Sequence, residues 1–557
     1  MNIGLAIHFG GYFDSLKGIS QELLRLLGTG HQVHRLLPPV AYQSPEDEQT
    51  HAEEIVRASD VLVGFHSILT PLLAARSRLS LPRPCALFPL GAFSRGAGAI
   101  RQLLPHLTID DVFVANCSAD VALIRTFLPE ARVELIPFAV DPTVFCPLAP
   151  EERAECRARF RLPAAAPVIL YAGRMTLEKN LHTVLRVFAA THRHLHDAIL
   201  VLAGPIQDVP FSEAGVAPVS LARWIDKIVL NLRMPPKHIR YLGPLGPRQL
   251  RELYNTADVA MNLTLHHDEN FGLAQVEAIA CGTPVIGTAW GGLRDTIRDG
   301  INGYQVGVLV TPLGVKLNWW SAINKTVRLL TIDAKATRFE RPAIASTAAE
   351  YLPMLFQRRV LGLLESLGRG SVSRPTPLAM SHFAYEFWDF CIPGPTNEAR
   401  YPAGTRAFQL YRDLIGMYAA ATPDTLTAAT PLEDDQVLLL AAPTAIVGRS
   451  TITVHDPMYP LSCRVAAEKQ ASVSAVIRAM MVEPAMTVAR VRDDVLRGQA
   501  RSLDAIRWML SLGLLLRSPN INHAMLPLAA IGADTIALSF VTQRVDRSAT
   551  DFLAFEG

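Results

Sequence analysis

The chain has 557 residues, of which 50% are hydrophobic and 19% are charged, a composition typical of a folded globular protein and not of a disordered one. This length exceeds what one hydrophobic core usually organises and predicts about three or four domains. The net charge is only +2 and no dense run of Lys or Arg occurs, which argues against a nucleic-acid partner. Seven cysteines stand singly, which favours reduced thiols and a cytoplasmic location over a disulfide framework or a zinc site.

The sequence predicts neither a signal peptide nor a membrane span. The opening "MNIGLAIHFGGYF" has no basic segment and no long apolar segment of the kind that directs secretion. The longest apolar runs, at 437–448 and 509–516, fall short of the roughly 18 to 20 residues that cross a bilayer. Membrane contact is therefore expected to be peripheral at most.

The first 145 residues alternate short apolar runs with longer amphipathic ones, from "NIGLAIHF" and "GISQELLRLLGTG" to "DVFVAN" and "VELIPFAV". Continuous apolar strands separated by helical patterns are typical of a parallel sheet covered on both faces. We therefore predict a doubly wound α/β domain over residues 1–160.

The same rhythm restarts with "PVILYAGR" and continues through "AILVLAGP" to "PVIGTA". This predicts a second doubly wound domain over residues 161–367, whose last helix could cross back to the first domain. Ligands of such sheets bind outside the carboxyl ends of the strands. Two facing domains of this kind are expected to enclose a ligand cleft.

Residues 368–377, "GRGSVSRPTP", are rich in Gly, Ser and Pro, as is typical of a linker. An extra C-terminal α+β region is expected over residues 378–557. Up to about residue 432 it is aromatic and Pro-rich with weak periodicity, and it gives no clear assignment. Around 435–520, strands followed by three helical segments and a further strand indicate a winged-helix-like module.

A signature of eight residues lies in "ENFGLAQVEAIACGTPV", residues 269–285. It resembles the Glu-x7-Glu signature of the family 4 retaining glycosyltransferases. At about one in fifteen per fixed position, a chance match is on the order of one in a billion per start site. The resemblance covers roughly residues 1–367 and implies two facing Rossmann-like domains of the GT-B type. The matching positions are Glu269, Phe271, Gly272, Glu277, Ala278, Gly282, Pro284 and Val285.

The residues of this stretch also favour a nucleotide-sugar site on physical grounds. Gly272 lets the backbone approach a ligand, and the helix after it begins with unpaired amides. The backbone N–H groups of residues 271–273, at the start of this helix, favour binding of a diphosphate or a sugar oxygen. The predicted ligand-binding residues here are Asn270, Phe271, Gly272 and Leu273. A carboxylate repels phosphate, so Glu269 is expected to accept from the donor sugar and Glu277 from the ribose, as the resemblance also implies. The alternative is a pair of solvated glutamates on a helix face.

Two further elements resemble the same family. In "GRMTLEKN", Arg174 follows a strand and Lys179 precedes a helix, and the resemblance implies that both bind the donor diphosphate. Cleaving the anomeric C–O bond leaves added negative charge there, which preorganised cations stabilise. Gly10 and Gly11 stand at a predicted strand-to-helix turn, where the resemblance implies contact with the donor phosphates. The alternative for "GRMTLEKN" is a surface loop.

One feature departs from the family pattern. Many members carry a His after a strand of the first domain, whereas this sequence has Leu90 before Gly91. His66, at the end of an earlier predicted strand, is either a substitute or a structural histidine. No Asp-x-Asp metal site is evident, and the adjacent His266 and His267 would point to opposite faces of a strand. No metal and no other cofactor is expected.

The sequence is therefore interpreted as a retaining glycosyltransferase, hexosyl or related, with Glu269, Arg174 and Lys179 as catalytic residues. It would move a sugar from a nucleoside-diphosphate sugar to an unidentified glycan, lipid, small-molecule or protein acceptor. Without an obvious enzymic nucleophile, same-face substitution assisted by the departing phosphate is favoured. The alternatives are a nucleotide-sugar epimerase or hydrolase on the same fold, and a catalytically impaired scaffold that binds nucleotide sugar.

The C-terminal region is expected to recruit a protein or peptide acceptor. The rival hypothesis is nucleic-acid binding through the arginines of residues 490–507. Asp493, Asp494 and Asp504 offset those arginines, so the protein partner is preferred.

Overall fold

In the computed structural model the chain folds into two compact units. The first unit comprises Met1–Asp141, His267–Leu273 and Glu350–Pro393, and the second comprises Pro142–His266, Ala274–Ala349 and Gly394–Gly557. The residues described are 1–7, 14–90, 101–176, 179–206, 221–232, 234–265, 269–311, 314–334, 338–369, 376–391, 406–422, 431–441, 445–447, 451–454, 461–483, 485–497 and 502–518.

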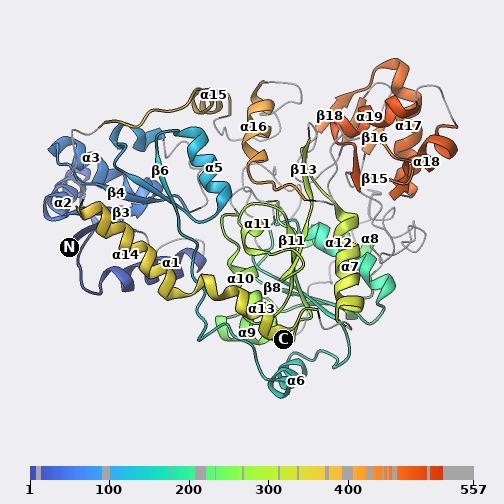
Figure 1. The fold of residues 1–557 in the computed structure, drawn as a ribbon, viewed down its shortest axis with the longest axis horizontal. Coiled ribbons are helices and arrows are strands. Elements are labelled where there is room, and N and C mark those ends of the chain that lie inside the picture. Colours follow the sequence, from blue (N-terminus) through green and yellow to red (C-terminus); the bar gives the residue numbers. More distant parts are fainter. Residues whose placement is uncertain are drawn as a thin grey trace. The chain divides into compact units, whose positions relative to one another are not determined.

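The first unit is built on a six-stranded parallel sheet (Figure 1). Its strand order is β2-β1-β3-β4-β5-β6, so the direction of winding reverses beside β1. Every residue of β3, β4 and β5 is buried, whereas β2 and β6 at the edges are partly exposed. The strands are β1 Asn2–Ala6, β2 Gln32–Arg35, β3 Val61–Phe65, β4 Cys85–Phe88, β5 Val112–Ala115 and β6 Arg132–Leu135.

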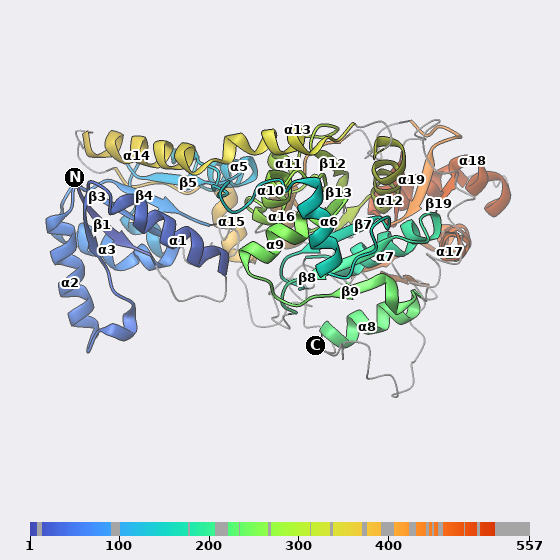
Figure 2. The ribbon, with the colours of Figure 1, turned by 90° about the horizontal axis from the view of Figure 1, so that it is seen from below.

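Helices cover both faces of this sheet, as its continuous apolar strands require. Ile55 of α2 lies on the face that carries Leu62, and Gly368 of α14 lies against the neighbouring Val61, which points to the other face. Figure 2 shows α2 and α14 on opposite sides of the strands. The helices are α1 Asp14–Leu27, α2 Pro45–Ala58, α3 Thr70–Leu79, α5 Ser118–Phe127, α14 Pro353–Arg369 and α15 His382–Cys391, with short turns η1 Pro39–Ala41, η2 His66–Leu69 and η3 Leu104–His106.

A buried ion pair ties three elements of the first unit together. Arg76 of α3 donates from Nη1 and Nη2 to the two carboxylate oxygens of Asp111, over 2.6 and 2.9 Å. Asp111 also accepts from the backbone N–H of Cys85 at 2.9 Å and of Thr108 at 2.8 Å. The Asp111 side chain is completely buried and that of Arg76 is 6% exposed. The pair therefore joins α3, the start of β4 and the turn before β5.

The first unit also includes chain from far along the sequence. Pro377 forms an antiparallel bridge with Thr108, and Phe383 and Phe387 of α15 pack edge-on against Phe127 of α5. The sequence analysis assigned residues 376–391 to the linker and the extra domain. The structure instead groups them with the first unit, where the buried Phe387 and the partly buried Phe383 pack against Phe127 of α5.

The second unit contains another six-stranded parallel sheet, with the order β12-β11-β10-β7-β8-β9. The prediction of two doubly wound Rossmann-like sheets is thus confirmed. The strands are β7 Val168–Ala172, β8 Ile199–Ala203, β9 Ile239–Tyr241, β10 Val259–Asn262, β11 Val285–Thr288 and β12 Gly303–Val306, followed by the antiparallel hairpin β13 Val308–Thr311 and β14 Gly314–Leu317.

The helices of this sheet alternate with its strands, as the sequence rhythm indicates. They are α6 Pro150–Arg159, α7 Leu181–His194, α8 Leu221–Asn231, α9 Pro247–Thr256, α10 Leu273–Ala280, α11 Leu293–Thr296, α12 Trp319–Arg328 and α13 Arg341–Ser346, with short turns η4 Pro236–His238, η5 Leu329–Asp333 and η6 Thr347–Tyr351.

Helix α6 lies in the second unit, whereas the sequence analysis placed residues 150–159 in the first domain. Arg157 pairs with Asp258 at 2.7 Å, and Arg159 pairs with Glu252 of α9 at 2.7 Å. These ion pairs join the charged helix to the second sheet domain. The first unit accordingly ends at Asp141 and not at residue 160.

Residues after the second sheet domain return to the end of β11. Helix α16, Arg406–Gly416, leads to Tyr418, whose ring stacks on Trp290 with centroids 5.6 Å apart and an interplanar angle of 25°. Both rings are fully buried, and Arg294 Nη1 donates to the Met417 carbonyl at 2.8 Å. This stretch is part of the second sheet domain's core.

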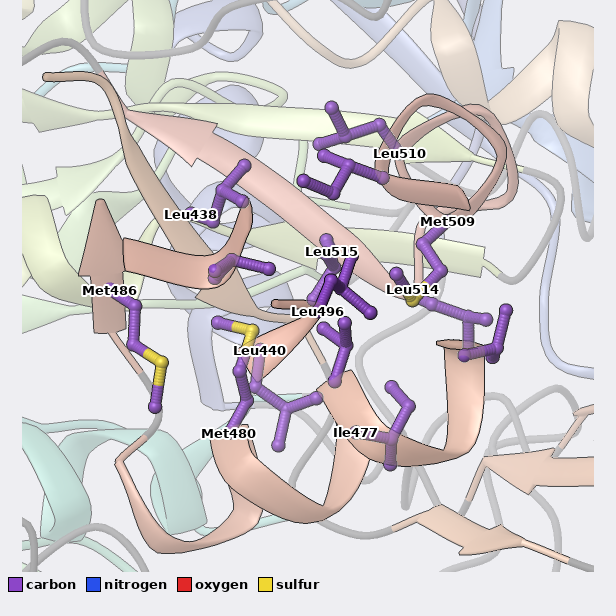
Figure 3. Packing of buried hydrophobic residues seen from close by; sticks show 14 of the residues in the cluster. Leu438, Leu440, Ile477, Met480, Met486, Leu496, Met509, Leu510, Leu514 and Leu515 are labelled. Carbon is purple, nitrogen blue, oxygen red and sulfur yellow. The ribbon is translucent and has the colours of Figure 1, made fainter. Parts of the chain in front are cut away.

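The described residues between 431 and 518 form a further module, called the module of residues 431–518, with its own hydrophobic core. Its central strand β15 pairs antiparallel with β19 and with β20. Figure 3 shows Leu438 and Leu515 of this sheet packed with Met480 of α17 and Met509 of α19. The elements are β15 Val437–Leu440, β16 Ala445–Val447, β17 Thr451–Val454, β18 Leu461–Arg464, α17 Ala467–Val482, β19 Ala485–Thr487, α18 Val488–Arg490, η7 Val491–Val495, α19 Ser502–Leu512 and β20 Leu515–Ser518.

The module is attached to the hairpin β13–β14 and to the start of α12. Trp319 Nε1 donates to the Leu440 carbonyl at 3.0 Å, and Asn318 Nδ2 lies 3.2 Å from Ser518 Oγ. Gly513 has φ +81, and a Cβ there would lie 2.0 Å from Thr311 Oγ1. The three predicted helical segments are present, while the winged-helix-like assignment stays a prediction. Within the described part of the chain, every helix is too short or too polar to cross a membrane.

Candidate functional site

Three predicted site residues of the second unit follow two adjacent strands. Strands β7 and β10 pair in parallel, so their carboxyl ends lie at one edge of the sheet. Arg174 comes two residues after β7, Lys179 lies just before α7, and Glu277 is on α10, which follows β10. This edge is where ligands of doubly wound sheets bind.

Asn180 connects the segment that carries Lys179 to the chain leaving β10 through hydrogen bonds. Its Nδ2 donates to the Leu263 carbonyl at 2.8 Å, and its Oδ1 accepts from Thr183 Oγ1 at 2.6 Å. Asn180 is buried and has φ +59, a left-handed conformation that Asn tolerates better than most residues. The sequence analysis missed this residue, although an Asn just before a helical pattern is a helix-start signal.

Two glycines allow the ends of β7 and β8 to approach closely. Gly173 has φ +146 and Gly204 has φ +131, and a Cβ on Gly204 would lie 2.0 Å from the Gly173 carbonyl oxygen. The next carbonyl group, that of Arg174, accepts a hydrogen bond from Tyr171 Oη at 2.7 Å. The close contact between Gly173 and Gly204 and the hydrogen bond from Tyr171 therefore fix the backbone just before and just after the Arg174 side chain.

Glu277 has a direct partner in Tyr254 of α9, which the sequence analysis also missed. Tyr254 Oη donates to Glu277 Oε2 at 3.0 Å. Part of the Glu277 residue remains exposed to solvent, whereas protein surrounds its carboxyl group. Burial raises the pKa of Glu277 to about 7, although the hydrogen bond from Tyr254 lowers it. Burial raises the pKa of Tyr254 well above its usual value, and the neighbouring Glu277 adds to the effect.

Helix α10 ends in a glycine of the predicted signature. Gly282 has φ +75 and donates to the Ile279 carbonyl at 2.8 Å, while Thr283 N–H donates to Ala278 at 2.9 Å. A Cβ on Gly282 would lie 2.7 Å from the Arg341 Cβ. This signature glycine is required by the helix end and its close neighbour.

The other glutamate, Glu269, belongs to the first unit. Its side chain is 8% exposed. The next residue, Asn270, donates from Nδ2 to Asn116 Oδ1 at 3.2 Å, and Asn116 donates to the Ile136 carbonyl at 2.8 Å. Asn116 directly follows β5, so the Glu269 loop is fixed at the carboxyl end of that strand.

Phe271 anchors the same loop through its ring. It packs edge-on against Phe138 and Tyr351, with centroids 5.7 and 5.3 Å away, and is 2% exposed. Gly272 then has φ +85 before α10 begins at Leu273. The ring of Phe271 therefore has a packing role, whereas the ligand role predicted for the amides of residues 271–273 stays a prediction.

The structure describes only some of the remaining candidate residues. Gly10, Gly11, His266 and His267 lie outside the described residues. Leu90, which stands where many family members have a His, follows β4 with φ +55, a strained conformation for a branched side chain. Among the residues that the structure describes, no group of three or more His, Cys, Asp and Glu side chains is arranged to hold a metal ion.

Comparison with known families bears on this part of the chain. Residues 152–312 match the family "Glycosyl transferases group 1". The matched segment covers less than a third of the 557 residues and contains Arg174, Lys179 and the signature at 269–285. The matched segment thus lies mostly within the second unit.

Two curated relatives match over a similar length. A D-inositol 3-phosphate glycosyltransferase of Xylanimonas cellulosilytica is 31% identical over 180 residues, which are 31% of this chain and 39% of the relative. One of Kineococcus radiotolerans is 33% identical over 223 residues, 37% of this chain and 47% of the relative. The chain thus spans less than half the length of these relatives.

Solved structures resemble the chain at low sequence identity. Anabaena HepE, solved with UDP, has a TM-score of 0.49 at 16% identity and covers 66% of this chain and 100% of its own. Sucrose-phosphate synthase of Thermosynechococcus elongatus has a TM-score of 0.48 at 18% identity, with the same coverage. The strand orders of the two parallel sheets are what identify the fold.

Proposed function

We propose that this protein is a retaining glycosyltransferase that moves a sugar from a nucleoside-diphosphate sugar to an acceptor hydroxyl. The observation that supports this proposal is that the chain leading to Arg174 and Lys179 and the chain leading to Glu277 follow two adjacent parallel strands, β7 and β10. The cationic segment after β7 is tied by Asn180 to the chain after β10, and that chain leads to the helix of Glu277. Under this proposal, the segments after two neighbouring strands provide the cations for the diphosphate and a carboxylate for the ribose hydroxyls.

Each candidate residue has a chemical role in the proposed reaction. Arg174 and Lys179 stabilise the negative charge that develops on the diphosphate as the anomeric C–O bond breaks. Glu277 accepts hydrogen bonds from the ribose, and Glu269 accepts them from the donor sugar. The acceptor oxygen attacks from the face that the phosphate leaves, and its proton passes to the departing phosphate oxygen. No metal or other cofactor is part of this proposal.

The first test is a thermal-shift panel of uridine, guanosine, thymidine and adenosine diphosphates. One of them is expected to raise the melting temperature, because a ligand at 100 times its dissociation constant stabilises the folded state by about 2.7 kcal/mol. The matching sugar nucleotide is then incubated with and without candidate acceptors, and the released diphosphate is measured.

Three outcomes separate the proposal from its alternatives. Diphosphate release that depends on an acceptor supports transfer. Turnover of the donor without an acceptor indicates an epimerase or hydrolase, and binding without turnover indicates a scaffold. Failure of all four diphosphates to stabilise the protein contradicts the proposed donor site.

The module of residues 431–518 is proposed to recruit a protein or peptide acceptor. A chain that ends at Thr422 tests this role, because it keeps residues 376–391 on the first unit and Tyr418 on Trp290. This shortened chain is expected to bind the donor nucleotide normally and to lose sugar transfer to proteins of a cell extract, measured with a radiolabelled donor. The full chain carrying Lys179→Ala serves as the control for labelling that does not come from transfer. Equal labelling by the full and shortened chains contradicts the role.

A further inference from the structure

We propose that Tyr254 is a positioning residue for donor binding, because its hydroxyl holds Glu277 Oε2 and leaves the other carboxylate oxygen for the ribose. This inference rests on the proposed function and adds a residue that none of the predicted motifs contains. Tyr254 lies on α9, 23 residues before its partner, and the two side chains meet through a hydrogen bond of 3.0 Å.

Tyr254 is well suited to fix another side chain because its own position is determined by several contacts. Its ring packs against Phe145, with centroids 6.2 Å apart and an interplanar angle of 62°. Its carbonyl oxygen accepts from Thr283 Oγ1 at 2.6 Å. The next residue, Asn255, accepts from Leu148 N–H at 2.8 Å. The residue is 1% exposed, so the phenol has little freedom to move.

The direction of the hydrogen bond follows from the chemistry of the two groups. When Glu277 is ionised its carboxylate only accepts, so above its pKa the phenol must donate. Burial holds the pKa of Tyr254 well above its usual value, so the phenol keeps its proton throughout the neutral range. The hydrogen bond engages Oε2 and restricts the Glu277 rotamer, which reduces the side-chain entropy lost when a ligand binds. Oε1 then meets the incoming hydroxyls in a prepared geometry.

The same contact sets the pH range in which Glu277 accepts most strongly. Burial raises its pKa to about 7, and the Tyr254 hydrogen bond lowers it. Cys281 also couples to Glu277, because burial and then the Glu277 charge raise the pKa of its thiol. Arg251 and Arg341 act on Cys281 in the opposite sense. Protonation removes the negative charge of Glu277, which weakens it as a hydrogen-bond acceptor for the ribose. Nucleotide binding should therefore weaken as the pH falls through about 7.

Removing the hydroxyl tests the inference with a matched control. Tyr254→Phe is expected to raise the dissociation constant of the stabilising diphosphate about tenfold at pH 7.5, measured by calorimetry. Without the phenol hydroxyl as hydrogen-bond donor, the pKa of Glu277 rises further, so the pH midpoint of diphosphate binding also moves upward. Tyr304→Phe is the control, because Tyr304 Oη donates to the carboxylate of Asp333 at 2.7 Å in the same unit. The control should leave both the affinity and the pH midpoint unchanged.

Phe145→Leu is a second variant, which loosens the phenol ring and keeps its hydroxyl. It is expected to raise the dissociation constant less than Tyr254→Phe does, and it keeps the inference testable if that variant does not fold. Wild-type affinity and an unmoved pH midpoint in Tyr254→Phe overturn the inference, as does wild-type affinity in Phe145→Leu when only that variant folds. If the wild-type protein binds none of the four diphosphates, the proposed donor site fails instead.

Discussion

Replacing Lys179 with alanine is expected to lower the rate of sugar transfer about 100- to 1,000-fold while the protein stays folded. Loss of one preorganised charge that faces a developing anion typically costs about 3 to 4 kcal/mol of barrier. The fold should survive because the backbone here is held by the neighbouring Asn180, which keeps its bonds to Leu263 and Thr183. The measurements are the turnover rate of the donor and the melting temperature.

The matched control for this prediction is Lys237→Ala. Lys237 lies in η4 of the same unit and is exposed. Its replacement therefore also removes one positive charge, at a position outside both motifs. Its turnover should equal that of the wild type. Wild-type turnover in Lys179→Ala would remove the basis for assigning the segment after β7 to diphosphate binding.

Replacing Arg76 with alanine should produce the largest loss of stability among the changes considered. Asp111 is completely buried, and without Arg76 its charge would lose a bidentate partner and stay away from water. Removing one partner of a buried pair typically costs about 3 to 5 kcal/mol. Urea denaturation followed by circular dichroism measures the free energy of unfolding.

Two further variants make this stability prediction specific. Arg57→Ala breaks an exposed ion pair with Glu53 at 3.1 Å and should change stability little, since exposed pairs contribute little. Arg76→Met combined with Asp111→Leu should cost less than Arg76→Ala, because it leaves no buried charge without a partner. A loss in Arg76→Ala as small as that in Arg57→Ala would contradict the structural role of the pair.

The two sheets were predictable from sequence because their strands are short, continuous apolar runs. Periodicity reports that a segment is buried, and in "VLVGF" at 61–65 or "ILVLA" at 199–203 every residue is buried on both faces. The turn at Gly272 was predictable for a similarly local reason, because glycine adopts a positive φ without steric cost.

The tertiary partners of the site were not predictable in this way. Tyr254 reads only as an apolar position of the helix "RQLRELYNTA", since nothing in its local sequence identifies Glu277 as its partner. Asn180 and Leu263 are separated by 83 residues, and Phe383 and Phe127 by an even longer stretch of chain. Burial patterns predict that such side chains are covered, and they do not predict what covers them.

Two of the signature residues have packing roles in the structure. Gly282 is required where α10 ends against Arg341, and Phe271 is held between Phe138 and Tyr351. Selection for a stable fold would retain both residues in a descendant that had lost its chemistry. Under the proposed function the positions that report on activity are the charged ones, and a homologue that keeps the glycine and the aromatic residue but lacks Lys179 is expected to fold and to show no sugar transfer.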